Sequence, residues 1–408
     1  MGGEAEKQRR AVQYLRHRLR RSRPYRPGPF GAVYALLLVG GLAGAATVYL
    51  GLVAWVPGSA ANRTDTLKTA LLVVAGSGAG AGLYLQYRKQ RTDEASHVRD
   101  QDKLFTERYT AAVAQLGSAS AAVRAGGVNA LGRIADDSER DRATCLEMLC
   151  IYLRMPFDTD DGDPSERQVR TTAQRVLGER LRPEHMGFWS DAKVDLRGAT
   201  LIDLQFDGII TNVALFHGVK FAGNTWFKGA VFGGESSFSD AVFAGQAAFD
   251  GCRFAAGVSF AKANFQDAWF RGAVFEGYAT FDNTTFKENA WFKRASFNRG
   301  AYFHSASFLK QGRFPEATFK EVANFREATF AKGTTFDGSR FEGNAVFGKA
   351  NFGRSPGFDA AAFHASAVFQ EAIFEQPPSF TGARFHFQYP PQWPDGYNTP
   401  VDLGEPLD

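Results

Sequence analysis

Cysteine is scarce in this 408-residue sequence, which holds only Cys145, Cys150 and Cys252. Three cysteines exclude a disulfide framework, and their spacing does not provide the paired ligands of a structural zinc site. A chain without disulfides fits a reducing compartment. Cys145 and Cys150 fall in one expected helix, where we expect them to pack in a core.

Catalytic signatures are absent as well. The seven histidines are scattered, and there is no Ser/His/Asp arrangement, no HExxH motif and no pair of catalytic carboxylates. The acidic stretch DTDDGDP at 158–164 places Gly162 where a calcium loop needs a ligand, so we interpret it as a solvated turn. We therefore expect a protein that is not an enzyme and that binds no cofactor and no metal.

Charge of one sign is not in large excess, because the net charge is only +4, but the charge is unevenly placed. The first 29 residues hold nine lysines and arginines against two glutamates. We interpret 1–29 as a basic arm that contacts a membrane surface, with nucleic-acid binding by the arm as the alternative.

Two long runs that are nearly free of charge follow the arm, at 30–56 and 67–87. Each is long enough to cross about 30 Å of hydrocarbon as a helix, so we predict a transmembrane helix hairpin over 30–87. Neither run shows a polar face, which argues against a pair of buried core helices. Small residues four apart would let the two helices pack closely. They are Gly40 and Gly44 in the first run, and Gly76 and Gly80 in the second.

Basic residues lie on the same side of both runs. The arm precedes the first run, and Arg88, Lys89 and Arg91 follow the second. The positive-inside rule then predicts a multi-pass plasma-membrane protein with both termini in the cytoplasm. Because the arm would lie against anionic headgroups, we expect the lipid bilayer to be a partner.

A helical region is expected at 88–190, where Ala, Leu, Arg and Glu are frequent. Apolar residues at helical spacing indicate four helices in it. Their sequences begin near Leu104, Ser120, Glu139 and Arg167.

Phenylalanine dominates the remainder of the chain, which has 38 phenylalanines, nearly all after residue 205. Up to Phe385 the steps between them alternate between five and six residues, with one step shortened at Phe265 to Phe270. In a helix, steps of five and six would place the Phe side chains on all sides, and in a strand a step of five would move the next Phe to the opposite face. Neither a helix nor a single strand therefore explains the repeat. What remains is a chain that turns between phenylalanines, so that every ring points at one axis. We therefore predict a β-solenoid with an eleven-residue double repeat, whose core includes Phe281, Phe286, Phe292, Phe297, Phe303 and Phe308.

The residue two places before each phenylalanine supports this prediction, because it is nearly always small, as in Ala290 before Phe292. Positions two apart share one face of a strand, so both point inward. The residue between them points outward and varies freely.

These repeats resemble those of the pentapeptide-repeat proteins, whose consensus is A(D/N)Lxx. VDLRGATLIDLQFDG, from Val194, matches the consensus, and ANFQD and ATFKE match its Phe form. The resemblance implies a right-handed quadrilateral β-helix over 191–386 with four sides per coil. Family coils have twenty residues whereas four sides here amount to twenty-two, so we infer a bulge or widened turn on two sides. The front of the chain also resembles membrane-anchored actinobacterial members.

The two ends of a solenoid are open sheet edges that must be covered. We expect the helical region to cover the first coil. The proline-rich tail at 387–408 has two interpretations, a cap on the last coil or a disordered end.

Three tryptophans mark one side of the expected solenoid, because Trp226, Trp269 and Trp291 each directly precede a core phenylalanine of the same side. Outward tryptophans with Lys293 and Arg294 beside them are candidates for binding a partner. The alternative is a surface ladder that stabilises neighbouring coils.

We predict a non-enzymatic, membrane-tethered scaffold that presents a rigid β-helix to a cytoplasmic protein partner. The resemblance implies an alternative, a DNA-mimicking protein that binds gyrase or another topoisomerase. Mimicry needs a strongly negative rod, but residues 191–390 hold 20 Lys and Arg against 19 Asp and Glu. Mimicry is therefore not favoured, and nucleic acid is not an expected partner.

Overall fold

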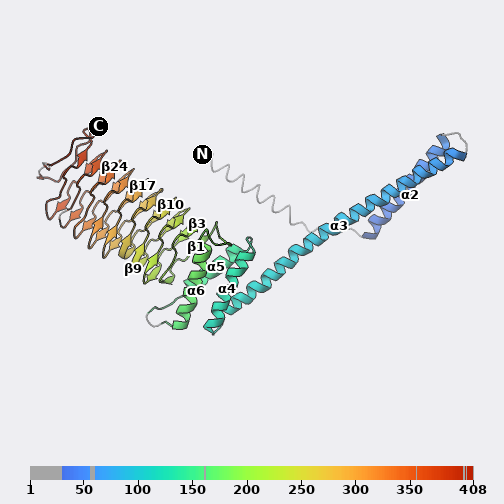
Figure 1. The fold of residues 1–408 in the computed structure, drawn as a ribbon, viewed down its shortest axis with the longest axis horizontal. Coiled ribbons are helices and arrows are strands. Elements are labelled where there is room, and N and C mark those ends of the chain that lie inside the picture. The colour runs from blue at the N-terminus through green and yellow to red at the C-terminus, as the bar shows by residue number, and fades with distance from the viewer. Residues whose placement is uncertain are drawn as a thin grey trace. The chain divides into compact units, whose positions relative to one another are not determined.

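The computed structural model describes residues 30–55, 60–159, 162–354, 356–397, 400 and 402–407 (Figure 1). The predicted basic arm, 1–29, lies outside the described residues. The chain divides into two compact units, residues 1–103 and 104–408, and each is described by itself.

The first unit consists of α2 (Phe30–Trp55) and most of α3 (Ala60–Leu116). Both nearly uncharged runs are helical, as predicted. The second does not end near residue 87, however, because α3 continues through Arg88, Lys89 and Arg91 as one helix of 57 residues. The apolar run is therefore part of a longer helix that also carries charge.

The predicted membrane location is wrong. Spanning a bilayer takes about 20 consecutive, predominantly apolar residues in a helix, and within the described ranges no helix meets the requirements of length and apolarity. The prediction of a multi-pass plasma-membrane protein with both termini in the cytoplasm is corrected accordingly. The lipid bilayer as a partner of the basic arm stays a prediction, because the arm lies outside the described residues.

The glycines predicted to pack the hairpin lie in these two helices. Among the described residues, a Cβ atom added at Gly40 or Gly44 would meet nothing within 4 Å, so the described part of the chain shows no close helix contact at either glycine. Gly76 and Gly80 lie in α3, and their surroundings fall outside what the structure describes, so packing through them stays a prediction.

The second unit begins with the end of α3 and three further helices, α4 (Ala121–Asp137), α5 (Arg142–Arg154) and α6 (Pro164–Arg180). The start of α6 follows from its sequence, because the Asp163 side chain accepts a hydrogen bond from the Ser165 amide and Pro164 suits the first turn. Each helix buries apolar residues in a shared core. They include Val128, Leu131, Leu149, Leu153, Ala173 and Leu177.

A polar cluster around Glu166 ties the three helices together. Its carboxylate accepts hydrogen bonds from Arg124 at 3.0 Å, from Arg170 at 3.0 Å and from the Tyr152 hydroxyl at 2.8 Å. Burial, aided by Glu166, raises the pKa of Tyr152 to about 12, so its hydroxyl stays a donor. Because each buried group is paired, the cluster fixes the helices without leaving an isolated charge.

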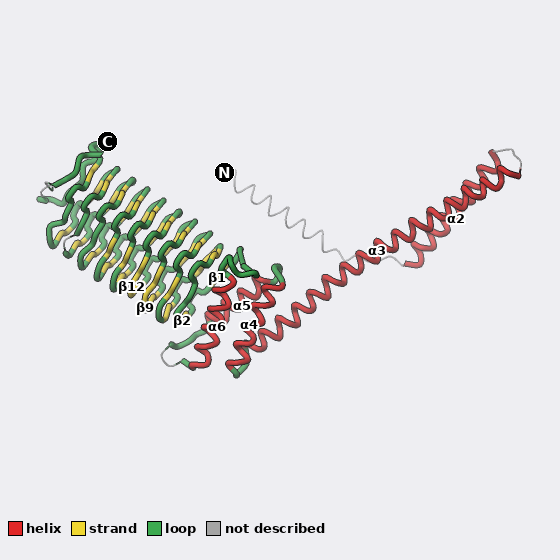
Figure 2. The backbone as a smooth tube through the Cα atoms, in the orientation of Figure 1, coloured by secondary structure: helices red, strands yellow, loops and turns green. Residues whose placement is uncertain are grey.

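The remainder of the unit is a solenoid of parallel strands, which confirms the predicted fold (Figure 2). Three continuous sheets run along it, and we name the faces in the order in which the chain meets them. The first face contains β1 (Lys193–Asp195), β4 (Val213–Leu215), β8 (Ser236–Ser237), β11 (Val258–Ser259), β14 (Ala279–Thr280), β18 (Ala301–Tyr302), β22 (Ala323–Asn324), β25 (Ala345–Val346) and β28 (Ala367–Val368).

The second face contains β2 (Thr200–Ile202), β5 (Lys220–Ala222), β9 (Val242–Ala248), β12 (Asn264–Trp269), β15 (Thr285–Phe286), β19 (Ser307–Phe308), β23 (Thr329–Phe330), β26 (Asn351–Phe352) and β29 (Ile373–Phe374). The fourth face contains β3 (Ile210–Thr211), β7 (Val231–Phe232), β10 (Arg253–Phe254), β13 (Val274–Phe275), β17 (Ser296–Phe297), β21 (Thr318–Phe319), β24 (Arg340–Phe341), β27 (Ala362–Phe363) and β30 (Arg384–Phe385).

The third face is built from the ends of β9 and β12, from isolated bridges, and from β6 (Thr225–Trp226), β16 (Ala290–Trp291) and β20 (Gly312–Arg313). Each coil therefore has four sides. The first coil has 20 residues, since Lys193 pairs with Val213, whereas most later coils have 22, as when Ala279 pairs with Ala301.

The two extra residues of a long coil fall on alternate corners. After the first and third faces the next phenylalanine comes five residues on, and the corner holds a residue with positive φ, such as Asn283 (56°) or Arg294 (57°). After the second and fourth faces it comes six residues on. A residue in the left-handed backbone conformation closes the corners after the first and third faces tightly. The corners after the second and fourth faces hold one more residue each, so two of the four sides are widened.

The axis of the solenoid is filled by phenylalanine rings. Phe281, Phe286, Phe292, Phe297, Phe303 and Phe308 are all fully buried. Rings one coil apart stack nearly parallel, with the centroids of Phe281 and Phe303 4.7 Å apart. Rings on opposite sides meet edge to face, as Phe281 of the first face and Phe292 of the third do at 5.5 Å. Both arrangements are favourable for aromatic pairs.

Both ends of the solenoid are covered. At the start, the helices supply hydrogen bonds to the first coil, including a pair between the Gln174 side chain and the Ile202 backbone at 2.7 and 2.8 Å. At the other end, Trp393 stacks on Phe369 at 5.2 Å and contacts Phe380 edge to face at 5.2 Å. Of the two interpretations of the tail, the cap is the one that its described part adopts.

Candidate functional site

The three predicted tryptophans lie in one row on the third face, which we call the tryptophan face. Trp226 pairs with Ala248, Ala248 with Trp269, and Trp269 with Trp291. The next residue in the row is Arg313. The spacing of the sequence therefore placed the three tryptophans on one side, with Trp269 and Trp291 on adjacent levels, as the structure shows.

The tryptophan side chains point outward because the residues on either side of them point inward. Ala268 and Phe270 flank Trp269 and are fully buried, and Ala290 and Phe292 do the same around Trp291. The three indoles are themselves half-buried. Ala248, between the levels of Trp226 and Trp269, is only 2% exposed, so the surface above it is covered. The half-buried indoles thus form a strip along the tryptophan face that is interrupted at Ala248.

Two arginines, which sequence reasoning missed, complete this strip. The guanidinium of Arg271 lies over the Trp269 ring at 4.5 Å, and that of Arg313 lies over the Trp291 ring at 4.6 Å. A cation over an indole face is an attractive arrangement worth about 0.5–1 kcal/mol at exposed sites. The signal was present in the sequence, because Arg313 follows Trp291 at the 22-residue repeat.

The two arginines differ in their other contacts. Arg271 also donates to both carboxylate oxygens of Asp250 at 3.1 Å, and this contact raises the pKa of Arg271. Arg313 has no acidic partner among the residues that the structure describes. Arg271 is therefore held in place, whereas the charge of Arg313 is available to a carboxylate from outside.

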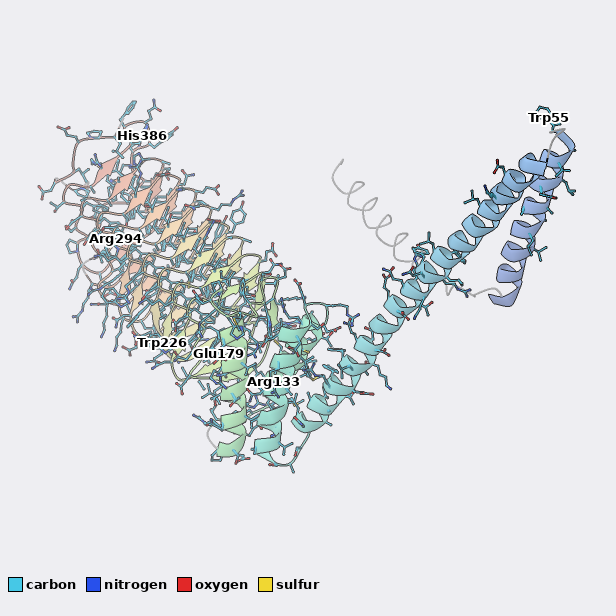
Figure 3. The ribbon with its side chains drawn as sticks, turned by 45° about the vertical axis from the view of Figure 1, so that its right-hand side comes forward. Trp55, Arg133, Glu179, Trp226, Arg294 and His386 are labelled. Carbon is cyan, nitrogen blue, oxygen red and sulfur yellow. The ribbon has the colours of Figure 1, made fainter. Side chains whose placement is uncertain are left out.

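Lys293 and Arg294, the predicted cations beside the tryptophans, follow Phe292 at the corner after the tryptophan face. Figure 3 labels Arg294 on the solenoid. Both are exposed and share Glu316, at 3.6 Å from Lys293 and 2.6 Å from Arg294. Arg294, with Lys293, lowers the pKa of Glu316. The pair of cations is thus partly neutralised within the protein, and as an exposed ion pair it contributes little stability.

The cysteines do not form a reactive site. All three are buried, and burial raises the pKa of Cys145 and of Cys150 to about 12 and that of Cys252 still further. A thiol that stays protonated is a poor nucleophile. In the described part of the chain, no group of three or more His, Cys, Asp or Glu residues is placed to hold a metal ion.

Comparison with known proteins identifies the repeats. A family model described as pentapeptide repeats (9 copies) matches residues 209–253, 238–285, 281–320 and 314–361. The matches lie within the solenoid and include all three tryptophans. Neither a curated protein nor a solved structure matches the chain.

Proposed function

We propose that this pentapeptide-repeat β-solenoid protein is a non-enzymatic scaffold that presents the tryptophan face to a protein partner. The observation that carries the proposal is the outward strip of indoles with an arginine over each of Trp269 and Trp291. Tryptophan and arginine are the residues that most often dominate the binding energy of protein interfaces.

The coil does not require large residues at these places. The corresponding positions on later coils are Thr335, Gly357 and Ser379, which pair in the same row. Because small residues serve the stack equally well there, the tryptophans and Arg313 supply something other than coil geometry.

The rigidity of the solenoid supports the proposal. Each level is held by parallel pairing on both sides and by stacked rings at the axis, so the indoles are fixed before a partner arrives. Binding then orders few additional groups, which lowers the entropic cost of association. The unpaired Arg313 favours a partner with a carboxylate beside an apolar patch, because a charged hydrogen bond would form there.

The test compares partner capture by three forms of the full chain. They are the unsubstituted protein, Trp269→Ser with Trp291→Ser, and Tyr302→Ser, a matched control that removes an outward aromatic from the first face. Proteins retained from an extract of the source cells are quantified by mass spectrometry. We expect a protein retained by the unsubstituted chain and the control to fall about tenfold or more with the double variant. An identical retained set for all three forms would reject the proposal.

A further inference from the structure

Basic side chains gather at the corner where the chain turns from the second face to the tryptophan face. Four consecutive coils, beginning with that of Trp291, each place a cation within two residues after the second-face phenylalanine. The four cations, which we call the basic row, are Lys287, Lys310, Lys332 and Arg354. Backbone hydrogen bonds join these corners from coil to coil, as from the Leu309 amide to the Phe286 carbonyl at 2.9 Å. The basic row therefore follows the axis of the solenoid.

Most of this charge is not neutralised within the protein. In the sequence of the four corners Glu288 is the one acidic residue, and it pairs with Lys310. Three members of the basic row are exposed and have no ion-pair partner among the described residues. They are Lys287, Lys332 and Arg354. Arg313, whose guanidinium lies over Trp291, adds a further positive charge beside the row.

The surfaces on either side of the basic row do not offset this charge. The outward residues of the second face on the same coils are uncharged. They are Thr285, Ser307, Thr329 and Asn351. On the tryptophan face the outward residues of the last two of these coils are Thr335 and Gly357. The acids at the corner beyond, Asp337 and Asp359, accept hydrogen bonds from the amides of Asp359 at 3.1 Å and Thr381 at 2.9 Å. Positive charge is therefore in excess at the basic row.

The coil does not require a cation at this corner. The position that Lys332 and Arg354 occupy, two residues after the phenylalanine, holds other residue types elsewhere. They are Gly223, Gly245, Asp267 and Gln376. Like charges on neighbouring coils repel each other, so a run of cations that the fold does not need is best explained by an anionic partner.

We propose that the partner of the tryptophan face presents an acidic amphipathic α-helix, which lies along the basic row with its carboxylates toward the cations. The inference rests on the proposed function, because an apolar stripe of the same helix would pack against Trp291 at one end of the row. Tryptophan would supply most of the affinity, and the exposed ion pairs would fix the direction and choice of partner.

The spacing of the basic row favours a helix over an extended segment. Neighbouring coils are about 4.8 Å apart, so the first and last cations are separated by about 14 Å along the axis. Carboxylates three or four residues apart line one face of a helix and advance by about 16 Å over three turns. Carboxylates on one face of an extended strand would advance by about 20 Å over three steps. Flexible Lys and Arg side chains can take up the smaller difference.

The arginines of the tryptophan face argue against a nucleic acid as the occupant. Single strands bind where cations lie beside aromatic rings on which the bases stack. Here a guanidinium already lies over Trp269 at 4.5 Å and another over Trp291 at 4.6 Å, so a base would have to displace it. An acidic helix needs no stacking on these ring faces, and we therefore infer a protein partner.

The experiment measures the binding of three blocked, fluorescently labelled peptides to the full chain by fluorescence anisotropy. The acidic peptide is Ala-Gln-Glu-Leu-Ala-Gln-Glu-Leu-Ala-Glu-Leu-Ala-Gln-Glu-Leu-Ala-Gln-Ala, whose glutamates and leucines form adjacent stripes of a helix. The second peptide has glutamine in place of each glutamate. The third has proline in place of the two central alanines, which prevents a continuous helix.

We expect the acidic peptide to bind about tenfold or more tightly than either of the other two, because only it presents charge on a helix. Equal binding of the glutamine peptide would show that the charge is not recognised. Equal binding of the proline peptide would show that no helix is needed. Either result, or no binding of the acidic peptide, would overturn the proposal.

Two variants locate the binding. Lys332→Gln with Arg354→Gln removes two exposed charges, and we expect the affinities of the acidic and glutamine peptides to come within about threefold of each other. The matched control is Lys262→Gln with Lys320→Gln, two exposed lysines at other corners of the solenoid, and it should leave the preference intact. A preference that survives the first variant would place the helix elsewhere and contradict the proposal.

Two further measurements separate this inference from the proposed function and from attraction of any polyanion. Trp269→Ser with Trp291→Ser should weaken the acidic peptide about tenfold, and an unchanged affinity would show that the basic row acts apart from the tryptophan face. A short oligothymidylate of similar charge should compete poorly, and full displacement at matching concentration would show a nucleic-acid site. If the tryptophan variant loses a protein from the extract while the acidic and glutamine peptides bind equally, the proposed function stands and this inference fails.

Discussion

Aromatic rings fill the inside of the solenoid at every level, but they stand on its outside at only a few. Inside, Phe281, Phe303 and Phe325 repeat with centroids 4.7 Å apart at each step. Outside, the row of the tryptophan face changes from Trp291 to Arg313 within one coil. The interior regularity is a condition of the fold and says little about function. The irregular exterior is not required by the fold, so function is best sought there.

The largest effect should come from Phe303→Ala. The ring is fully buried and stacks on neighbours in both adjacent coils, so its removal leaves a cavity at the axis. We expect the free energy of unfolding to fall by about 3–5 kcal/mol, measured by urea denaturation. The adjacent variant Tyr302→Ala, which removes an outward ring at the same level, should cost less than about 1 kcal/mol. Similar losses for the two variants would break the distinction between inside and outside.

The next largest effect is expected in the first coil, where the Gln174 side chain makes the backbone hydrogen bonds that a preceding strand would otherwise make. Gln174→Ala leaves both the amide and the carbonyl of Ile202 without their partner, and both sit in a buried setting. We expect a loss of about 1–3 kcal/mol in the free energy of unfolding.

An exposed glutamine on the last complete coils serves as control for this change. Gln370→Ala should leave the denaturation curve unchanged within error. An unchanged curve for Gln174→Ala as well would show that the helical region does not cover this edge in solution.

A smaller effect is expected from Trp269→Ser with Trp291→Ser. Both indoles are half-buried, and the substitutions remove mainly the stacking of Arg271 and Arg313 on the two rings. We expect the free energy of unfolding, obtained from thermal unfolding, to fall by no more than about 1–2 kcal/mol. A loss as large as that of Phe303→Ala would favour the alternative, in which the indoles are a ladder that stabilises the coils.

The smallest effect is a dependence on pH at His364, on the fourth face. Burial lowers its pKa, and Arg340, Arg384 and His386 lower it further while Glu342 opposes them. Because the folded state disfavours the protonated ring, the contribution to stability is complete above the unfolded pKa of about 6.5 and is lost as the pH falls below it. His364→Gln should therefore lose less stability than the unsubstituted chain between about pH 7.5 and about pH 5.5. If thermal unfolding shows the same loss of stability on acidification for the variant and the unsubstituted chain, His364 does not contribute to the pH dependence.

Much of the fold could be predicted from the sequence because each phenylalanine marks one side of a coil. The alternation of five and six residues predicted the solenoid, and the 22-residue repeat placed Trp269 beside Trp291. The cations over Trp269 and Trp291 were missed, because they depend on how Arg271 and Arg313 fold back over the rings. The membrane prediction was wrong because it was drawn from the length of the uncharged runs, whereas no helix of the described residues combines the length and apolarity that a membrane span needs. The hydrogen bonds by which Gln174 covers the first coil could not be predicted either, since they depend on which helix residues reach which strand.

Hydroxyl-radical footprinting of the full chain tests the central claim most directly, because it reports the solvent contact of individual rings. We expect Trp226, Trp269 and Trp291 to be oxidised, whereas Phe281, Phe303 and Phe325 should be protected until the protein unfolds. Oxidation of those phenylalanines in the native protein, or protection of all three tryptophans, would contradict it.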